Sequence, residues 1–159
     1  SLSVTGEGDF AEVHGGGFQT RLFEVSGGGS LVLTRLKLSG GSAERGGAIH
    51  SQSATLTLNN CTLDGNVATD GNGGAVWADG GNVTIVGGEF LANYATGYGG
   101  AVYAVEGRLV IQGGSSLQDN KAIVGGAIFC GAEEAGTSKT AAYCSITGAK
   151  FLYNSAGHE

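Results

Sequence analysis

The four-residue motif GGA[IV] occurs four times in the chain and constrains the fold more than any other feature. It stands at 46–49, 73–76, 99–102 and 125–128, so successive copies begin 27, 26 and 26 residues apart. A second motif closes with asparagine and alternates with the first, as LDGN 63–66, FLAN 90–93, LQDN 117–120 and FLYN 151–154. Self-similarity at a fixed period of this size is typical of repeat architectures, in which each unit covers its neighbour. We therefore expect a solenoid.

Each period contains short runs of alternating apolar and polar residues, separated by glycine. Within residues 81–90, Val83, Ile85 and Phe90 are predicted to point inward and the polar residues between them outward. Helical repeats would need helix formers where this chain has glycine. We predict an all-β fold, a right-handed parallel β-helix of about five to six coils with three short strands per coil. The handedness follows from the general preference of parallel connections.

The whole chain, residues 1–159, is predicted to form a single β-helix domain. Its expected parts are an irregular first coil or cap at 1–25, regular coils at 26–129, an inserted loop at 130–144 and a last coil at 145–159. The inserted loop accounts for the last asparagine step of 34 residues, compared with 27 in the two earlier steps. The next Gly-Gly pair would be due at about residues 159–161, which predicts a longer solenoid or a last coil that another molecule covers.

The alternating GGA[IV] and FxxN motifs resemble the repeats of the chlamydial polymorphic membrane proteins. These are surface autotransporters whose passenger regions are β-helical adhesins. The resemblance covers roughly residues 46–154 and includes all four GGA[IV] copies, whereas Leu63 and Leu117 replace the phenylalanine in two of the asparagine motifs. It implies a surface adhesin or a structural passenger, not an enzyme.

Charge and hydropathy limit the classes of partner. The chain has 8 basic and 14 acidic residues, a formal charge of 8 − 14 = −6, and its lysines and arginines form no cluster, so nucleic acid is not expected as a partner. No run of about 18 apolar residues occurs, so no membrane span is expected in this chain. The sequence indicates no cofactor. The partners that we expect are a protein or a glycan at a surface, or further copies of the chain arranged end to end.

The three cysteines fall into two groups. Cys61 lies on the inward alternation and is predicted to be a small buried apolar residue. Cys130 and Cys144 bracket the inserted segment, and a disulfide between them is favoured over the alternative of two reduced, buried thiols. Such a bond would indicate an oxidising, extracytoplasmic setting, in a secreted or cell-surface protein.

The residue after each GGA[IV] motif is a ring-bearing one. If the preceding apolar residue points inward, the period of two places this residue outward, where the rings stack at the spacing of the coils. An exposed stack would contact sugar faces, apolar ligands or a partner protein. The alternative is that the inserted loop or a neighbouring subunit covers the stack, which then serves packing alone. The residues concerned are His50, Trp77, Tyr103 and Phe129.

Asparagines have two predicted roles. One set recurs at a single corner of the coil, where stacked amides hydrogen-bond along the solenoid axis and satisfy the turn backbone, and it comprises Asn66, Asn93, Asn120 and Asn154. Asn60 and Asn82 instead begin Asn-X-Thr sequons and are predicted to point outward. They are candidate N-glycosylation sites.

Acidic residues are candidates for catalysis, because polysaccharide lyases, hydrolases and epimerases also use this fold. Their chemistry needs acids clustered on neighbouring coils, as calcium ligands or as an acid and base pair. The outward position before the asparagine corner shows no such column, since its residues are Asp64, Leu91, Gln118 and Leu152. Glu133 and Glu134 fall in the inserted loop and are interpreted as a solvated turn. The histidines His14, His50 and His158 have no metal-ligand spacing, so no catalytic residue and no metal site are predicted.

Three hypotheses for the function remain at this point. The first is a non-catalytic structural or adhesive surface β-helix that assembles or adheres through its sides and open ends. The second is a β-helix that binds carbohydrate through the aromatic stack or modifies polysaccharides. The third is a fibre subunit in which the last coil of one molecule meets the first coil of the next.

Overall fold

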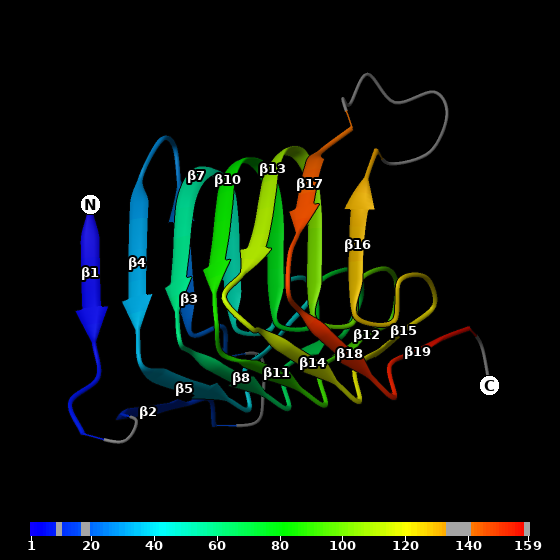
Figure 1. The fold of residues 1–159 in the computed structure, drawn as a ribbon, viewed down its shortest axis with the longest axis horizontal. Coiled ribbons are helices and arrows are strands. Elements are labelled where there is room, and N and C mark those ends of the chain that lie inside the picture. Colours follow the sequence, from blue (N-terminus) through cyan, green and yellow to red (C-terminus); the bar gives the residue numbers. More distant parts are fainter. Residues whose placement is uncertain (9–10, 17–19, 133–140, 158–159) are drawn as a thin grey trace.

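The computed structural model describes residues 1–8, 11–16, 20–132 and 141–157. Three parallel β-sheets stack as a solenoid of about five turns with three strands per coil, and no helix occurs in the described part. The chain runs down the near side and up the far side while it advances from left to right, so the solenoid is right-handed (Figure 1). The predicted fold class is confirmed.

The largest sheet contains three long strands that bend in the middle. Each bend lies at a residue with positive φ. These residues are Ser53 (48°), Gly80 and Gly81 (72° and 80°) and Glu106 (50°). At both ends of the sheet the same bend separates two shorter strands (Figure 1). The strands are β1 (Leu2–Thr5), β3 (Phe23–Ser26), β4 (Ser30–Thr34), β7 (Ile49–Asn59), β10 (Val76–Val86), β13 (Val102–Gln112), β16 (Ile128–Gly131) and β17 (Tyr143–Ile146).

The other two sheets contain one short strand from each coil. The second sheet comprises β2 (Ala11–His14), β5 (Leu36–Ser39), β8 (Thr62–Asp64), β11 (Glu89–Leu91), β14 (Ser116–Gln118) and β18 (Lys150–Leu152). The third comprises β6 (Ser42–Ala43), β9 (Val67–Ala68), β12 (Tyr94–Ala95), β15 (Lys121–Ala122) and β19 (Ser155–Ala156). The strand pairs of the described residues are parallel throughout, so equivalent residues of successive coils lie in columns along the axis.

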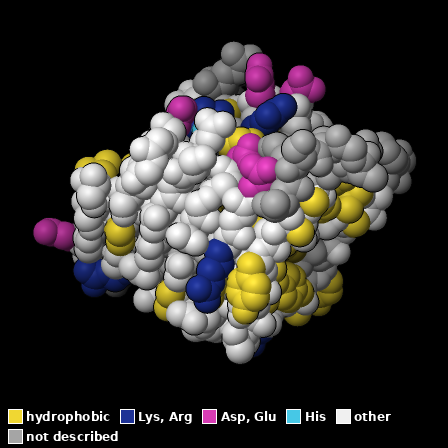
Figure 2. Space-filling view, turned by 90° about the horizontal axis from the view of Figure 1, so that it is seen from above, with side chains coloured by type: hydrophobic (Ala, Val, Ile, Leu, Met, Phe, Trp, Pro, Cys, Tyr) yellow, Lys and Arg dark blue, Asp and Glu magenta, His cyan; other side chains and the backbone are white. Residues whose placement is uncertain are grey.

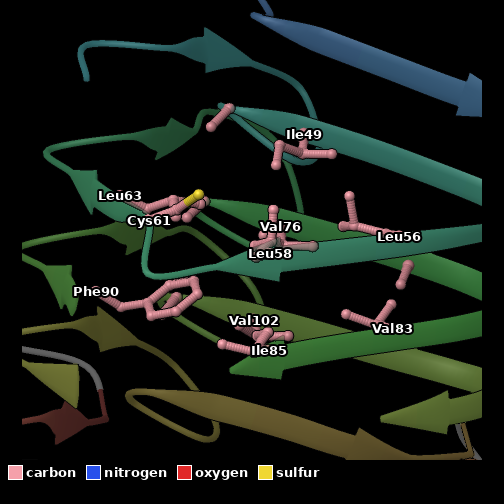
Figure 3. Close-up of a cluster of buried hydrophobic side chains, with 14 of the residues drawn as sticks. Ile49, Leu56, Leu58, Cys61, Leu63, Val76, Val83, Ile85, Phe90 and Val102 are labelled. Atoms are coloured by element: carbon pink, nitrogen blue, oxygen red, sulfur yellow. The ribbon is translucent and has the colours of Figure 1, made fainter. Parts of the chain in front are cut away.

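The core consists of such columns. Leu63, Phe90 and Leu117 are paired across β8, β11 and β14, and all three are 0% exposed. A second column begins with Leu31, which pairs with Leu56. Figure 3 shows apolar side chains of this core, among them Leu56, Leu63 and Phe90, directed into the interior of the solenoid. Complete burial of one such side chain stabilises the fold by about 1.5–3 kcal/mol.

The two glycines of the GGA[IV] motif are required for different structural reasons. The first, for example Gly73 with φ of 68°, adopts a left-handed conformation that L side chains rarely take. The second has no room for a side chain, because a Cβ atom at Gly74 would overlap the carbonyl oxygens of Gly100 and Tyr94. The motif therefore marks a corner at which the backbones of neighbouring coils come into direct contact.

The two irregular parts of the chain also belong to the sheets. Within residues 1–25, β1 pairs with β4 and β2 pairs with β5, so this segment stacks in register as a first coil. The predicted loop 130–144 is shorter than expected, because Cys130 and Gly131 continue β16 while Tyr143 and Cys144 begin β17. Both strands continue the parallel pairing with β13. Glu133 and Glu134 lie outside the described residues.

In the described part of the chain no helix has the length and the apolar character that crossing a bilayer requires.

Candidate functional site

The parallel register brings the four predicted ring-bearing residues into one column, the aromatic stack of His50, Trp77, Tyr103 and Phe129. The His50 and Trp77 ring centroids are 4.3 Å apart with an interplanar angle of 8°. The centroids of Trp77 and Tyr103 are 6.3 Å apart, and those of Tyr103 and Phe129 are 5.4 Å apart. The stack lies on the outer side of the largest sheet, because Ile49, Val76 and Val102 of the same strands belong to the core.

The two central rings of the aromatic stack are buried and the two outer rings, His50 and Phe129, are half-buried, which favours the packing alternative over an exposed surface. Trp77 is 3% exposed and Tyr103 is 0% exposed. Tyr98 packs against their cluster, and the Arg45 guanidinium carbon lies 5.9 Å from the centroid of the Trp77 ring. Both covering residues come directly before a GGA[IV] motif. Alternation within a strand predicts the side of the sheet on which a residue lies, but not that the preceding turn folds over it.

His50 forms one end of the aromatic stack and is half-buried. Its Nδ1 atom is buried and has no hydrogen-bond partner among the described residues. Burial lowers the pKa of His50, and the positive charges of Arg21 and Arg45 lower it further, while Glu24 opposes them in part. The neutral form of the imidazole is therefore favoured, which suits stacking against Trp77.

The four corner asparagines form a continuous hydrogen-bonded column, the asparagine ladder. In each rung the backbone N–H and the side-chain Nδ2 donate to Oδ1 of the asparagine in the following coil, at 2.9–3.0 Å. Nδ2 also donates to a backbone carbonyl of the preceding coil, for example from Asn93 to Leu63 O at 2.9 Å. Asn66, Asn93 and Asn120 are completely buried, so the ladder satisfies polar groups that water cannot reach.

A polar cluster on the second sheet was not predicted from the sequence. Ser39 Oγ donates to Glu12 Oε1 at 2.7 Å and lies 2.8 Å from His14 Nδ1. Lys37 Nζ lies 3.4 Å from Glu12 Oε1 and 3.6 Å from Asp64 Oδ2. The signal that would have found the cluster is the register of the first two coils, which pairs Glu12 with Lys37 and His14 with Ser39.

This cluster resembles the arrangement of a nucleophile with a base, but its details favour a structural role. The hydrogen bond from Ser39 and the charge of Lys37 hold the pKa of Glu12 below its usual value, so the carboxylate is a weak base. The Ser39 side chain is buried, which restricts access of a substrate to its oxygen. The cluster instead links side chains of successive coils.

The acidic residues do not form a catalytic column in the described structure. Asp64, Leu91, Gln118 and Leu152 occupy equivalent positions in β8, β11, β14 and β18. Among the residues that the structure describes, no three His, Cys, Asp or Glu side chains come together as metal ligands. His158 lies outside these residues.

The predicted disulfide is present. Cys130 and Cys144 are bonded with their Cα atoms 6.5 Å apart, and they join β16 to β17 beside the bend of the last coil. Cys61 is a buried free thiol, and burial raises its pKa. The sequon residues Asn60 and Asn82 are both exposed, as expected from the alternation.

The last coil exposes an apolar surface, the C-terminal face, which includes side chains whose counterparts in earlier coils are buried. Phe151 is 48% exposed, although it continues the column of Phe90 and Leu117, and Ile146 is 43% exposed, although its partner Ile111 is buried. A cavity of about 560 Å³ opens on this face, lined in part by Gly125, Gly126, Ile146, Phe151 and Asn154. Viewed from above, the larger hydrophobic areas lie toward this end of the solenoid (Figure 2).

Comparisons with protein-family models, with curated proteins and with solved structures give no match for this chain. The parallel β-solenoid is thus established by the structure. The resemblance of the repeat motifs to a particular family stays a prediction.

Proposed function

We propose that this chain is a non-catalytic structural and adhesive β-solenoid, which joins partners through its open C-terminal end and its sides. The observation that supports this function is the C-terminal face. Phe151 and Ile146 are exposed there, although their counterparts Leu117 and Ile111 in the preceding coil are buried. A contiguous exposed apolar surface marks an interaction site in soluble proteins.

The setting that we propose is extracytoplasmic, in a secreted or cell-surface protein. The disulfide between Cys130 and Cys144 supports it, because such bonds persist in oxidising compartments. The GGA[IV] and FxxN motifs support the more specific proposal that the chain belongs to the passenger repeats of polymorphic membrane protein-type autotransporters. An acidic charge of −6 suits a surface module that does not bind nucleic acid.

Carbohydrate binding is the main rival function, and the aromatic stack supports it only weakly. Because Trp77 and Tyr103 are buried, a sugar would have to displace Tyr98 and Arg45 to reach their rings. Trp77 is the single tryptophan, so its emission reports on the stack directly. We expect blue-shifted emission that acidic and neutral polysaccharides leave unchanged, with or without calcium, and no product. A saturable shift without product would establish a carbohydrate-binding protein, and product release would establish an enzyme.

The joining function is tested by giving the C-terminal face a coil to bind. A copy of residues 99–124 is appended to the full chain after His158, in place of Glu159, which keeps the spacing of five residues from Asn to Gly-Gly seen after Asn120. Stability in solenoids is approximately a sum over repeats and their interfaces. We therefore expect the thermal midpoint to rise by several degrees. The control extension has the same composition in scrambled order, and equal midpoints for the two extended chains would refute the joining function.

A further inference from the structure

The bend in the long strands divides the outer side of the largest sheet into two surfaces. One carries the aromatic stack. The other lies on β1, β4, β17 and the second halves of β7, β10 and β13, which run side by side toward the viewer in Figure 1. We propose that this second surface binds ice through two rows of short, uncharged side chains. These rows, the neutral face, comprise Ser3, Val32, Thr57, Thr84, Val110 and Ser145, and Thr5, Thr34, Asn59, Val86 and Gln112.

The register aligns each row of the neutral face along the solenoid axis. Thr57 pairs with Thr84 of the next coil, and Thr84 pairs with Val110 of the coil after that. The residues between the two rows, for example Leu58 and Ile85, are buried in the core, whereas no residue of the neutral face is buried. The neutral face therefore lies along the side of the coils, and the inference does not rest on the C-terminal face.

The neutral face carries no charge, although the adjacent sheet does. Its eleven residues are all Ser, Thr, Val, Asn or Gln. Protein surfaces contain about 25–35% charged residues, so roughly three charges would be expected among eleven outward side chains. In one outward row of the second sheet, four of the six residues are charged, namely Glu12, Lys37, Glu89 and Lys150. The absence of charge is thus a property of this face and not of the coils in general.

The composition of the neutral face distinguishes between kinds of partner. Protein interfaces are enriched in aromatic residues, methionine and arginine, and sugars pack against aromatic rings. The neutral face contains none of these residues. Arg108 and Tyr143 lie in the next row toward the bend, where the guanidinium carbon is 5.3 Å from the centroid of the tyrosine ring. The face instead presents hydroxyl, amide and methyl groups side by side, which hydrogen-bond water and confine it between them.

The neutral face is also a rigid lattice. Its side chains repeat about every 4.8 Å along the axis, and its two rows are about 6.6 Å apart. These repeats are close to the spacings between water oxygens on a prism face of hexagonal ice. Thr57 and Thr84 are stiff at χ1, so their methyl and hydroxyl groups keep their positions at little cost in entropy. Among the described residues, the one side-chain hydrogen bond within the face joins Asn59 Nδ2 to Thr34 Oγ1 at 3.4 Å, so most of its hydroxyl groups are left to bind water.

The test is thermal hysteresis, the gap between the melting and freezing temperatures of an ice crystal in a solution of the full chain. We expect the native chain to produce a gap and to shape the crystal into facets. Thr84→Lys, at the centre of the face, should reduce the gap about fivefold or more, because the ammonium group keeps its own hydration shell. Thr62→Lys is the matched control on the second sheet, where Thr62 already pairs with Lys37, and it should leave the gap unchanged. Val110→Lys is the second variant on the face, and circular dichroism checks that each chain is folded.

Other occupants of the neutral face are outcomes of the same set of variants. The absence of a gap and of facets with the native chain would overturn the proposal, as would equal gaps for Thr84→Lys and Thr62→Lys. A dimer in sedimentation velocity, or binding to crystalline chitin or cellulose, that Thr84→Lys abolishes would replace ice by a second copy or by a polysaccharide. The joining function fails separately, because a stabilising extension without a gap refutes ice binding alone, and a gap without stabilisation by the extension refutes the joining function alone.

Discussion

At the scale of single residues, the asparagine ladder concentrates hydrogen bonding at a few buried amides. Asn93 accepts from the backbone and side chain of Asn66, and donates to Leu63 O and to Asn120. Removing one partner of a buried hydrogen bond costs about 1–3 kcal/mol for each polar group left unsatisfied. The ladder therefore makes the corner a sensitive position in each coil.

We predict that Asn93→Ala lowers the free energy of unfolding by about 3 kcal/mol or more, because several buried groups lose their partner at once. Urea denaturation followed by circular dichroism measures the change. Asn82→Ala is the matched control, since Asn82 is exposed, and we expect it to change stability by less than about 0.5 kcal/mol. Similar losses for the two variants would contradict the structural role of the ladder.

His50 makes stability depend on pH in a defined direction. Its pKa is lower in the folded chain than in the unfolded chain, mainly through burial, so the unfolded state binds more protons as the pH falls through the unfolded value. Folding free energy from this residue is thus fully present above the unfolded pKa of about 6.5 and is lost as the pH falls below it.

We predict that His50→Phe flattens the stability profile between pH 8 and pH 5.5, since phenylalanine can stack on Trp77 but cannot titrate. Urea midpoints at several pH values, compared with those of the native chain, provide the measurement. An unchanged slope in the variant would show that His50 does not contribute to the pH dependence.

The candidate site was only partly predictable at this scale. Alternation placed the four rings in one column on the outer side of the sheet, and periodicity placed the asparagines at one corner, as the structure shows. Their burial differs because Arg45 and Tyr98 come from turns, to which alternation does not apply. The cluster around Ser39 was missed because only a residue-by-residue alignment of the first two coils brings Glu12 and His14 beside it.

At the scale of elements, the bend in the long strands is the feature that the sequence pattern did not predict. Gly80 and Gly81 mark it in one coil, but Ser53 and Glu106 adopt the left-handed conformation in the coils on either side. Because these two residues are not glycine, composition gave no consistent signal for the bend. The predicted loop was too long for a related reason, since the strands on both sides of the bend extend to Gly131 and Tyr143.

The disulfide stabilises the last coil by closing the segment between β16 and β17. We predict that the Cys130→Ser, Cys144→Ser double variant loses about 3 kcal/mol of unfolding free energy, as expected from the entropy of a loop of about 15 residues. Urea unfolding with and without a reducing agent measures this loss. The reduced native chain should match the double variant, and the reductant should not affect the variant. Destabilisation of the variant by the reductant would contradict this account.

At the scale of the whole molecule, each coil is stabilised by its neighbours, so equivalent side chains contribute unequally along the axis. Phe90 is 0% exposed between two coils, whereas Phe151 is 48% exposed on the C-terminal face. The architecture was predictable because a strict period forces equivalent residues into columns.

We predict that Phe90→Ala costs about 3–5 kcal/mol of unfolding free energy, while Phe151→Ala costs about 1 kcal/mol. Denaturant unfolding measures both values. Phe90→Leu should be tolerated at less than about 1.5 kcal/mol, since Leu63 and Leu117 occupy the same column, and it provides a folded reference. A loss at Phe151 as large as that at Phe90 would show that the C-terminal face is already covered in solution.

The bend also has a consequence for engineering. Between β16 and β17 the sequence has an insertion at this point, and the two strands still pair with the two halves of β13. The same site is available in the long strands at Gly80 and Glu106. Foreign peptides grafted there would be displayed along one edge of a rigid scaffold, separated by about 4.8 Å for each intervening coil. The number of coils between two grafting sites thus sets the distance between two epitopes.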